Sequence, residues 1–201
     1  MQFRFRVVPA TNGGDGRASF IPLLGDSIMI VALAISVSLF GGLATWLFMT
    51  TGAFFIWAAF VAWACFFQSG GDANAFKTTI ISNAFGVFVA WATALAIATI
   101  GGGPIVGASV VAVSIALYIL AAHLKPFASI PAVTYGYACT FAYVTQNADA
   151  FVPKVLLSLS MRNALWVIPW SMIIGACFAY ASATFASWLQ NKALGPRMEP
   201  V

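Results

Sequence analysis

The stretch FFQSGGDANAFKTTIISNAFGVFVAW, residues 66–91, decides the fold class of this chain. It places a polar patch, QSGGDANAFK, between two apolar runs, and the second run carries the amide of Asn83. An apolar run of about 18 residues or more can cross the ~30 Å hydrocarbon core of a bilayer as a helix. The stretch therefore predicts the end of one transmembrane helix, a solvated turn and the start of the next helix.

The composition of the whole chain indicates the same environment. Of its 201 residues, 62% are hydrophobic and 7% are charged, whereas a soluble domain carries about 25% charged residues. The apolar runs have no period of two, which the strands of a membrane barrel would require. We therefore expect an all-α, polytopic membrane protein.

Six transmembrane helices are predicted, at residues 28–49, 52–67, 78–100, 105–122, 130–144 and 164–189. They form one membrane domain, residues 28–190, between a polar amino-terminal segment, residues 1–27, and a tail, residues 191–201. The apolar run after the amino-terminal segment is too long for the core of a signal peptide, and we expect it to be retained.

The basic residues predict the orientation. With both termini in the cytoplasm, the inner segments hold seven basic residues and the outer ones hold two: Arg4, Arg6, Arg17, Lys77, Lys125, Lys192 and Arg197 against Lys154 and Arg162. This bias satisfies the positive-inside rule and predicts a bacterial cytoplasmic membrane protein with both termini inside. Because the basic residues stand singly at the ends of spans, they indicate contact with lipid head groups and no nucleic-acid partner.

Titratable groups give no support for an enzyme, a metal site or a cofactor. All five acidic residues fall outside the predicted spans, so no acid and base pair can be proposed. The three cysteines are in different spans with no metal-ligand spacing, which favours a packing role. His123, the single histidine, is expected at the membrane interface beside Lys125, as a head-group contact in preference to a gate or pigment ligand.

Prolines make the last two spans irregular. Pro126 and Pro131 belong before a helix or in its first turn, and Ser129 is a suitable cap. The fifth span is then about 22 Å long, short of the hydrocarbon core. Residues 153–163, PKVLLSLSMRN, are expected to lie in the outer interface or fold back, and Pro169 should bend the helix that follows.

Small residues recur at every fourth position in three spans and predict close helix packing, within the subunit or between subunits. The three series are Ser82, Gly86, Ala90, Ala94 and Ala98; Ala128, Ala132, Gly136 and Thr140; and Ser171, Gly175, Ala179, Ala183 and Ser187.

The order of elements resembles the YcdZ-like bacterial inner-membrane proteins, a domain family of unknown function. The similarity rests on FFQSGG, GVFVAW, FASIPAVTYGYACTF and IPWSMIIGACFAYASATFASWL. The amino-terminal extension and the segment NADAFVPKVLLSLSMRN depart from that pattern. The resemblance implies a multi-span cytoplasmic-membrane protein and supplies no catalytic residues.

Three functions remain open from the sequence. The first, which we favour, is a passive channel or facilitator for a small, mostly uncharged solute of the urea or short-amide class, working as a homo-oligomer. The second is a non-catalytic accessory or assembly subunit of a larger membrane complex, and the third, an intramembrane enzyme, has the least support. Asn83 and Tyr135, with the helix start at Ser129 and Pro131, are predicted to line a solute site on the cytoplasmic side, because amides and helix starts offer hydrogen bonds.

Overall fold

The computed structural model describes residues 16–194, with side chains from residue 27 onward. Most of the predicted amino-terminal segment, residues 1–27, and of the predicted tail, residues 191–201, lies outside the described residues. The same is true of Arg4, Arg6 and Arg197, which contribute to the predicted orientation.

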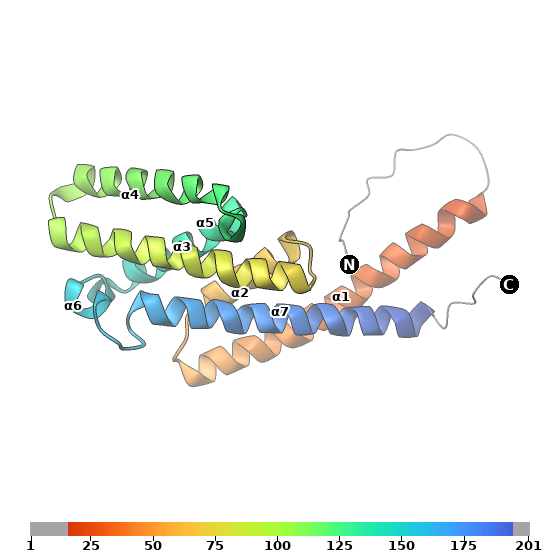
Figure 1. The fold of residues 1–201 in the computed structure, drawn as a ribbon. Coiled ribbons are helices and arrows are strands. Elements are labelled where there is room, and N and C mark those ends of the chain that lie inside the picture. Colours follow the sequence, from red (N-terminus) through yellow and green to blue (C-terminus); the bar gives the residue numbers. More distant parts are fainter. Residues whose placement is uncertain (1–15, 195–201) are drawn as a thin grey trace.

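Within the described residues the fold is all-α, as predicted, and contains no strand. The helices are α1 (Gly16–Thr51), α2 (Ile56–Gln68), α3 (Ala73–Ile100), α4 (Gly103–Leu120), α5 (Ile130–Gln146), α6 (Pro153–Leu156) and α7 (Ala164–Leu194) (Figure 1). Three short 3₁₀ turns, η1 (Ala121–His123), η2 (Lys125–Phe127) and η3 (Ala148–Ala150), join α4 to α5 and α5 to α6.

Four segments of the described chain are helical, long and apolar enough to cross a membrane: Ser27–Thr51, Ala73–Ile100, Gly103–His123 and Ala164–Leu194. Helices α2 and α5 have 13 and 17 residues, or about 20 and 26 Å at helical rise. Both are shorter than a ~30 Å hydrocarbon core. The predicted shortness of the fifth span is confirmed, and α2 is short as well.

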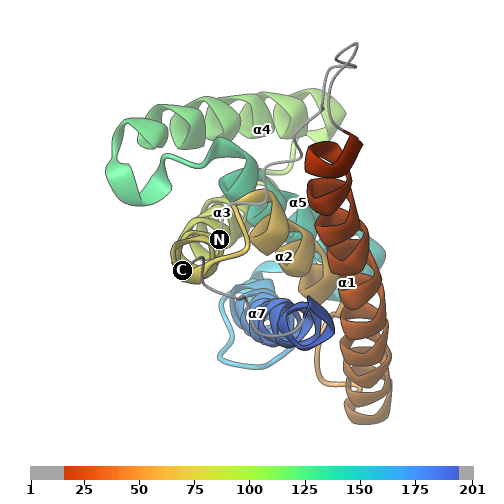
Figure 2. The same ribbon diagram turned by 90° about the vertical axis from the view of Figure 1, so that its right-hand side faces the viewer.

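The helices run back and forth between two ends of the bundle (Figure 1). One end, which we call the 69–72 end, holds the α2–α3 turn, the end of α4 and the start of α5. The opposite end, the α6 end, holds α6 and the start of α7. Viewed along the bundle, α2, α3 and α5 lie between α4 on one side and α7 on the other, and α1 lies at the periphery (Figure 2).

The small-residue series predicted as packing surfaces bring helices into backbone contact within the subunit. A Cβ atom added at Gly86 of α3 would lie 1.9 Å from the carbonyl oxygen of Val133 on α5. One added at Gly136 of α5 would lie 2.0 Å from the carbonyl oxygen of Asn83. Gly175 of α7 approaches α2 in the same way. These glycines allow helix axes to approach more closely than any larger residue would permit.

The turn predicted from the polar patch is shorter than its sequence suggests. The Asp72 carboxylate accepts a hydrogen bond from the backbone N–H of Ala75 at 2.7 Å and starts α3 at Ala73. Lys77 is therefore helical. Asn83 lies about 15 Å along α3 from its first residue, Ala73.

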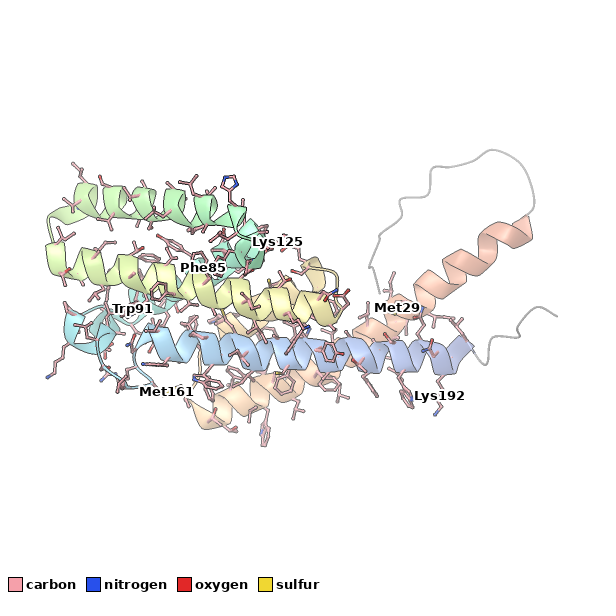
Figure 3. The ribbon with its side chains drawn as sticks, in the orientation of Figure 1. Met29, Phe85, Trp91, Lys125, Met161 and Lys192 are labelled. Atoms are coloured by element: carbon pink, nitrogen blue, oxygen red, sulfur yellow. The ribbon has the colours of Figure 1, made fainter. Side chains whose placement is uncertain are left out.

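The chain between α5 and α7 folds back against the bundle, one of the two arrangements predicted for residues 153–163. Leu156 of α6 is fully buried, and its carbonyl oxygen accepts hydrogen bonds from Trp91 Nε1 of α3 and from Asn163 Nδ2, both at 2.8 Å. Figure 3 shows Trp91 on the part of α3 that runs beside α6. Pro169 lies inside α7, as predicted.

Candidate functional site

Asn83 is the described side chain whose polar atoms are least satisfied. It is 1% exposed, and apart from the weakly polar Cys65 thiol beside it, neither its amide nitrogen nor its amide oxygen has a hydrogen-bond partner. A carboxamide can donate two hydrogen bonds and accept two, and burying one without partners costs several kcal/mol. A buried amide in this condition is a candidate for binding a ligand.

The side chain of Asn83 lies where α2, α3 and α5 meet. On α2 it adjoins the thiol of Cys65, and Thr79, one turn before Asn83 on α3, donates a hydrogen bond of 3.6 Å to the Cys65 sulfur. The backbone of Asn83 packs against Gly136 of α5. We call this place the α2–α3–α5 junction.

Tyr135 borders the junction on the side of the 69–72 end. Its hydroxyl donates a hydrogen bond to Gln68 Oε1 at the end of α2. Cys65 and Gln68 are three residues apart and therefore lie on one face of α2. Asn83 and Tyr135, two of the predicted site residues, thus approach the same turn of α2.

Ser129 and Pro131 lie at the start of α5, as predicted, and contribute less to the junction. Ser129 is the N-cap residue, but its side chain forms no capping hydrogen bond. Pro131 is exposed. It is four residues before Tyr135 and so lies on the same face of the helix. Of the four predicted site residues, Asn83 is the deeply buried one, and the others stand toward the 69–72 end.

Sequence reasoning missed Cys65 and Thr79 as neighbours of Asn83, and Gln68 as the hydrogen-bond partner of Tyr135. Thr79 and Asn83 are four residues apart, and Cys65 and Gln68 are three apart, so each pair occupies one helix face. This spacing was a usable signal, although it could not show that the two faces meet.

Toward the α6 end the junction is closed by an apolar cluster. Its buried members come from α2, α3, α5, α6 and α7: Ala58, Ala62, Val87, Ala94, Cys139, Val144, Leu156, Ala164, Val167, Ile168 and Met172. The junction is therefore polar toward the 69–72 end and apolar toward the α6 end. A molecule held at Asn83 would meet this cluster before it could leave at the α6 end.

Hydrogen bonding is the chemistry that the junction offers. The buried polar side chains in residues 27–194 are all uncharged: Ser36, Thr79, Ser82, Asn83, Thr93, Ser114, Thr140, Asn163, Ser171 and Ser182. No group of three His, Cys, Asp or Glu residues that could hold a metal ion occurs in the part of the chain that the structure describes.

Comparison with known proteins gives one match. Residues 34–187 match a family model described as a protein of unknown function, DUF1097. No curated protein and no solved structure matches. The matched region covers most of the chain, from within α1 to within α7, and the chain belongs to the DUF1097 family.

Proposed function

We propose that this DUF1097 protein is an integral membrane channel or facilitator that passes a small, mostly uncharged solute, of the urea or short-amide class, without energy coupling. The observation that carries the proposal is the buried, unpartnered carboxamide of Asn83. A solute with both an N–H donor and a carbonyl acceptor would satisfy both ends of this side chain.

The uncharged surroundings of Asn83 favour an uncharged solute. An ion would lose its hydration at the junction and find no opposite charge there, which costs far more than desolvating an amide. The Cys65 thiol and the Thr79 hydroxyl adjoin the site and add weak donors and acceptors. The proposed selectivity therefore lies in hydrogen bonding and size.

The proposed path enters from the 69–72 end. Tyr135 and Gln68 would have to part for a solute to pass between α2 and α5, and the positive end of the α5 helix dipole, at Ser129 and Pro131, would favour a solute oxygen. Exit requires movement of the apolar cluster around Leu156. The structure then corresponds to a closed state of the facilitator.

The wider setting is part of the same proposal. We place the protein in a bacterial inner membrane as a YcdZ-like protein with six membrane-inserted helices, α2 and α5 being the short ones. The termini are placed in the cytoplasm, which makes the 69–72 end cytoplasmic. Homo-oligomers are proposed, because a subunit of this size has little bulk in which to enclose a pore alone.

Osmotic flux in proteoliposomes tests the site. With urea and acetamide as probes, stopped-flow light scattering should show flux that Asn83→Leu lowers by about tenfold or more, because the leucine offers no hydrogen bond. Asn74→Leu is the matched control, since Asn74 is an exposed amide on the same helix, and should keep the flux. Both variants should unfold near the wild-type temperature.

Three results would contradict the proposal. Flux that persists in Asn83→Leu, or that is lost only together with folding, would make Asn83 a structural residue. Solute accumulation that collapses with an uncoupler would show active transport. Absence of flux together with stoichiometric partner chains after mild purification would favour an accessory subunit of a larger complex.

A further inference from the structure

A groove of about 530 Å³ separates α3 from α4. Its walls are mainly apolar, with Phe85, Phe88 and Ala92 on α3 and Val113 and Leu117 on α4. Val113 and Leu117 are each 61% exposed. Only Ser114 and Tyr118 of α4 are buried, so this helix leaves the groove open along most of its length.

The few polar groups in the groove already have partners inside the protein. Ser114 Oγ and the hydroxyl of Tyr137 on α5 are 2.8 Å apart, and Thr93 donates to the carbonyl oxygen of Val89 at 2.7 Å. Tyr118 accepts a hydrogen bond from Thr134 at 3.3 Å. The part of an occupant that enters the groove is therefore apolar.

The groove ends beside two basic residues. Phe85, at its end nearest the 69–72 end, stacks on Phe127 of η2 with ring centroids 4.0 Å apart. Lys125 begins η2, and His123 ends η1. Both side chains are exposed. Lys125 forms no ion pair among the described residues, where the one salt bridge joins Arg162 to Asp149.

The length of the groove matches one leaflet of a bilayer. Its lining on α3 extends from Phe85 to Ala96, about 16 Å along the helix, close to half of the ~30 Å hydrocarbon core. Figure 3 shows Lys125 and Phe85 toward the same end of α4, so the positive charge stands at one end of this half-membrane slot.

We propose that the α3–α4 groove binds one acyl chain of an anionic phospholipid whose phosphate pairs with Lys125. An apolar slot one leaflet deep with an unpaired cation at its mouth is complementary to a lipid with a negative head group. This site is separate from the α2–α3–α5 junction and does not depend on the proposed transport.

Native mass spectrometry of the detergent-purified protein tests the proposal. The probes are phosphatidylglycerol and phosphatidylcholine with identical acyl chains. We expect phosphatidylglycerol to bind about fivefold more tightly, the factor that one basic residue contributes near a membrane surface. Lys125→Gln should abolish this preference. Lys154→Gln, which removes an exposed charge at the α6 end, should leave it unchanged.

A second pair of variants tests the groove itself. Ala92→Phe fills it from α3, and Val113→Trp fills it from α4; both positions are exposed, so folding should survive in at least one variant. Either should weaken binding of both lipids without altering charge. Equal binding of the two lipids, a preference that survives Lys125→Gln, or full binding in the filled variants would overturn the proposal. A change of oligomeric state in the filled variants with lipid binding intact would instead make the groove an interface between copies.

Discussion

In residues 27–194 two asparagines are buried almost completely, Asn83 at 1% exposure and Asn163 at 2%, and their surroundings differ. Asn163 donates to the carbonyl oxygens of Leu156 and Ser158 and accepts from the N–H of Leu165. Asn83 makes no hydrogen bond of this kind to a backbone group. The same side chain thus fastens the folded-back segment in one region and leaves its hydrogen-bonding capacity open in the other.

The two regions are also held together by different forces. At the α2–α3–α5 junction, α3 and α5 touch through Gly86 and Gly136, where contact is between backbones. At the α6 end, hydrogen bonds from Trp91 and Asn163 converge on the carbonyl oxygen of Leu156. The junction should therefore be sensitive to added volume, and the α6 end to lost donors.

Gly136→Ala should have the largest effect on stability. The new Cβ would lie 2.0 Å from the carbonyl oxygen of Asn83, so the helices would have to separate, at a cost of about 3 kcal/mol or more of unfolding free energy. Thermal unfolding in detergent measures this loss. Gly107→Ala on α4 is the control, because no atom lies within 4 Å of its added Cβ. Wild-type stability in Gly136→Ala would mean that close helix contact does not hold Asn83 in place.

The sequence predicted which helices form better than it predicted which helices lie next to one another. The all-α fold and the short α5 follow from apolar runs and from prolines, whose effects are local, and folding back was one of the two arrangements predicted for residues 153–163. The small-residue series predicted close packing, but their spacing could not show which helices would touch. That pairing depends on contacts distant in sequence.

The candidate site shows the same limit. Asn83 stands out in a sequence because amides are rare in apolar runs, and Tyr135 lies at the predicted short helix. Their neighbours, Cys65 beside Asn83 and Gln68 beside Tyr135, belong to another helix. Asn163 carries the same side chain in a polar stretch and drew no prediction, because its partners are backbone groups that meet only after residues 153–163 fold back.

Asn163→Leu should have the second largest effect. It removes two donated hydrogen bonds and one accepted bond at a buried position, and the loss should be about 2–3 kcal/mol because Ser158 and Leu165 then lack partners. Asn147→Leu is the matched control, with a single bond to the carbonyl oxygen of Tyr143 lost. Thermal unfolding in detergent should show a clearly larger loss of stability for Asn163→Leu than for Asn147→Leu. Equal losses would show that Asn163 does not hold the segment.

Trp91→Phe should have the smallest effect on stability and tests most directly how the α6 end is held together. The phenyl ring keeps most of the packing but cannot donate to the carbonyl oxygen of Leu156, which retains its bond from Asn163. Because a single hydrogen bond between membrane helices contributes about 0.6 kcal/mol on average, stability should fall only slightly. Amide hydrogen exchange should nonetheless rise in residues 153–158, since one of the two donors to the Leu156 carbonyl is gone.

The control for this variant is Trp57→Phe, whose indole is 63% exposed and should change exchange nowhere near α6. If the apolar cluster around Leu156 closes the proposed path, Trp91→Phe should also raise urea flux, because the closed arrangement loses one of the two hydrogen bonds to the Leu156 carbonyl oxygen. Faster exchange with unchanged flux would mean that the folded-back segment does not close the proposed path. Unchanged exchange would mean that the hydrogen bond from Asn163 is sufficient to hold Leu156 in place.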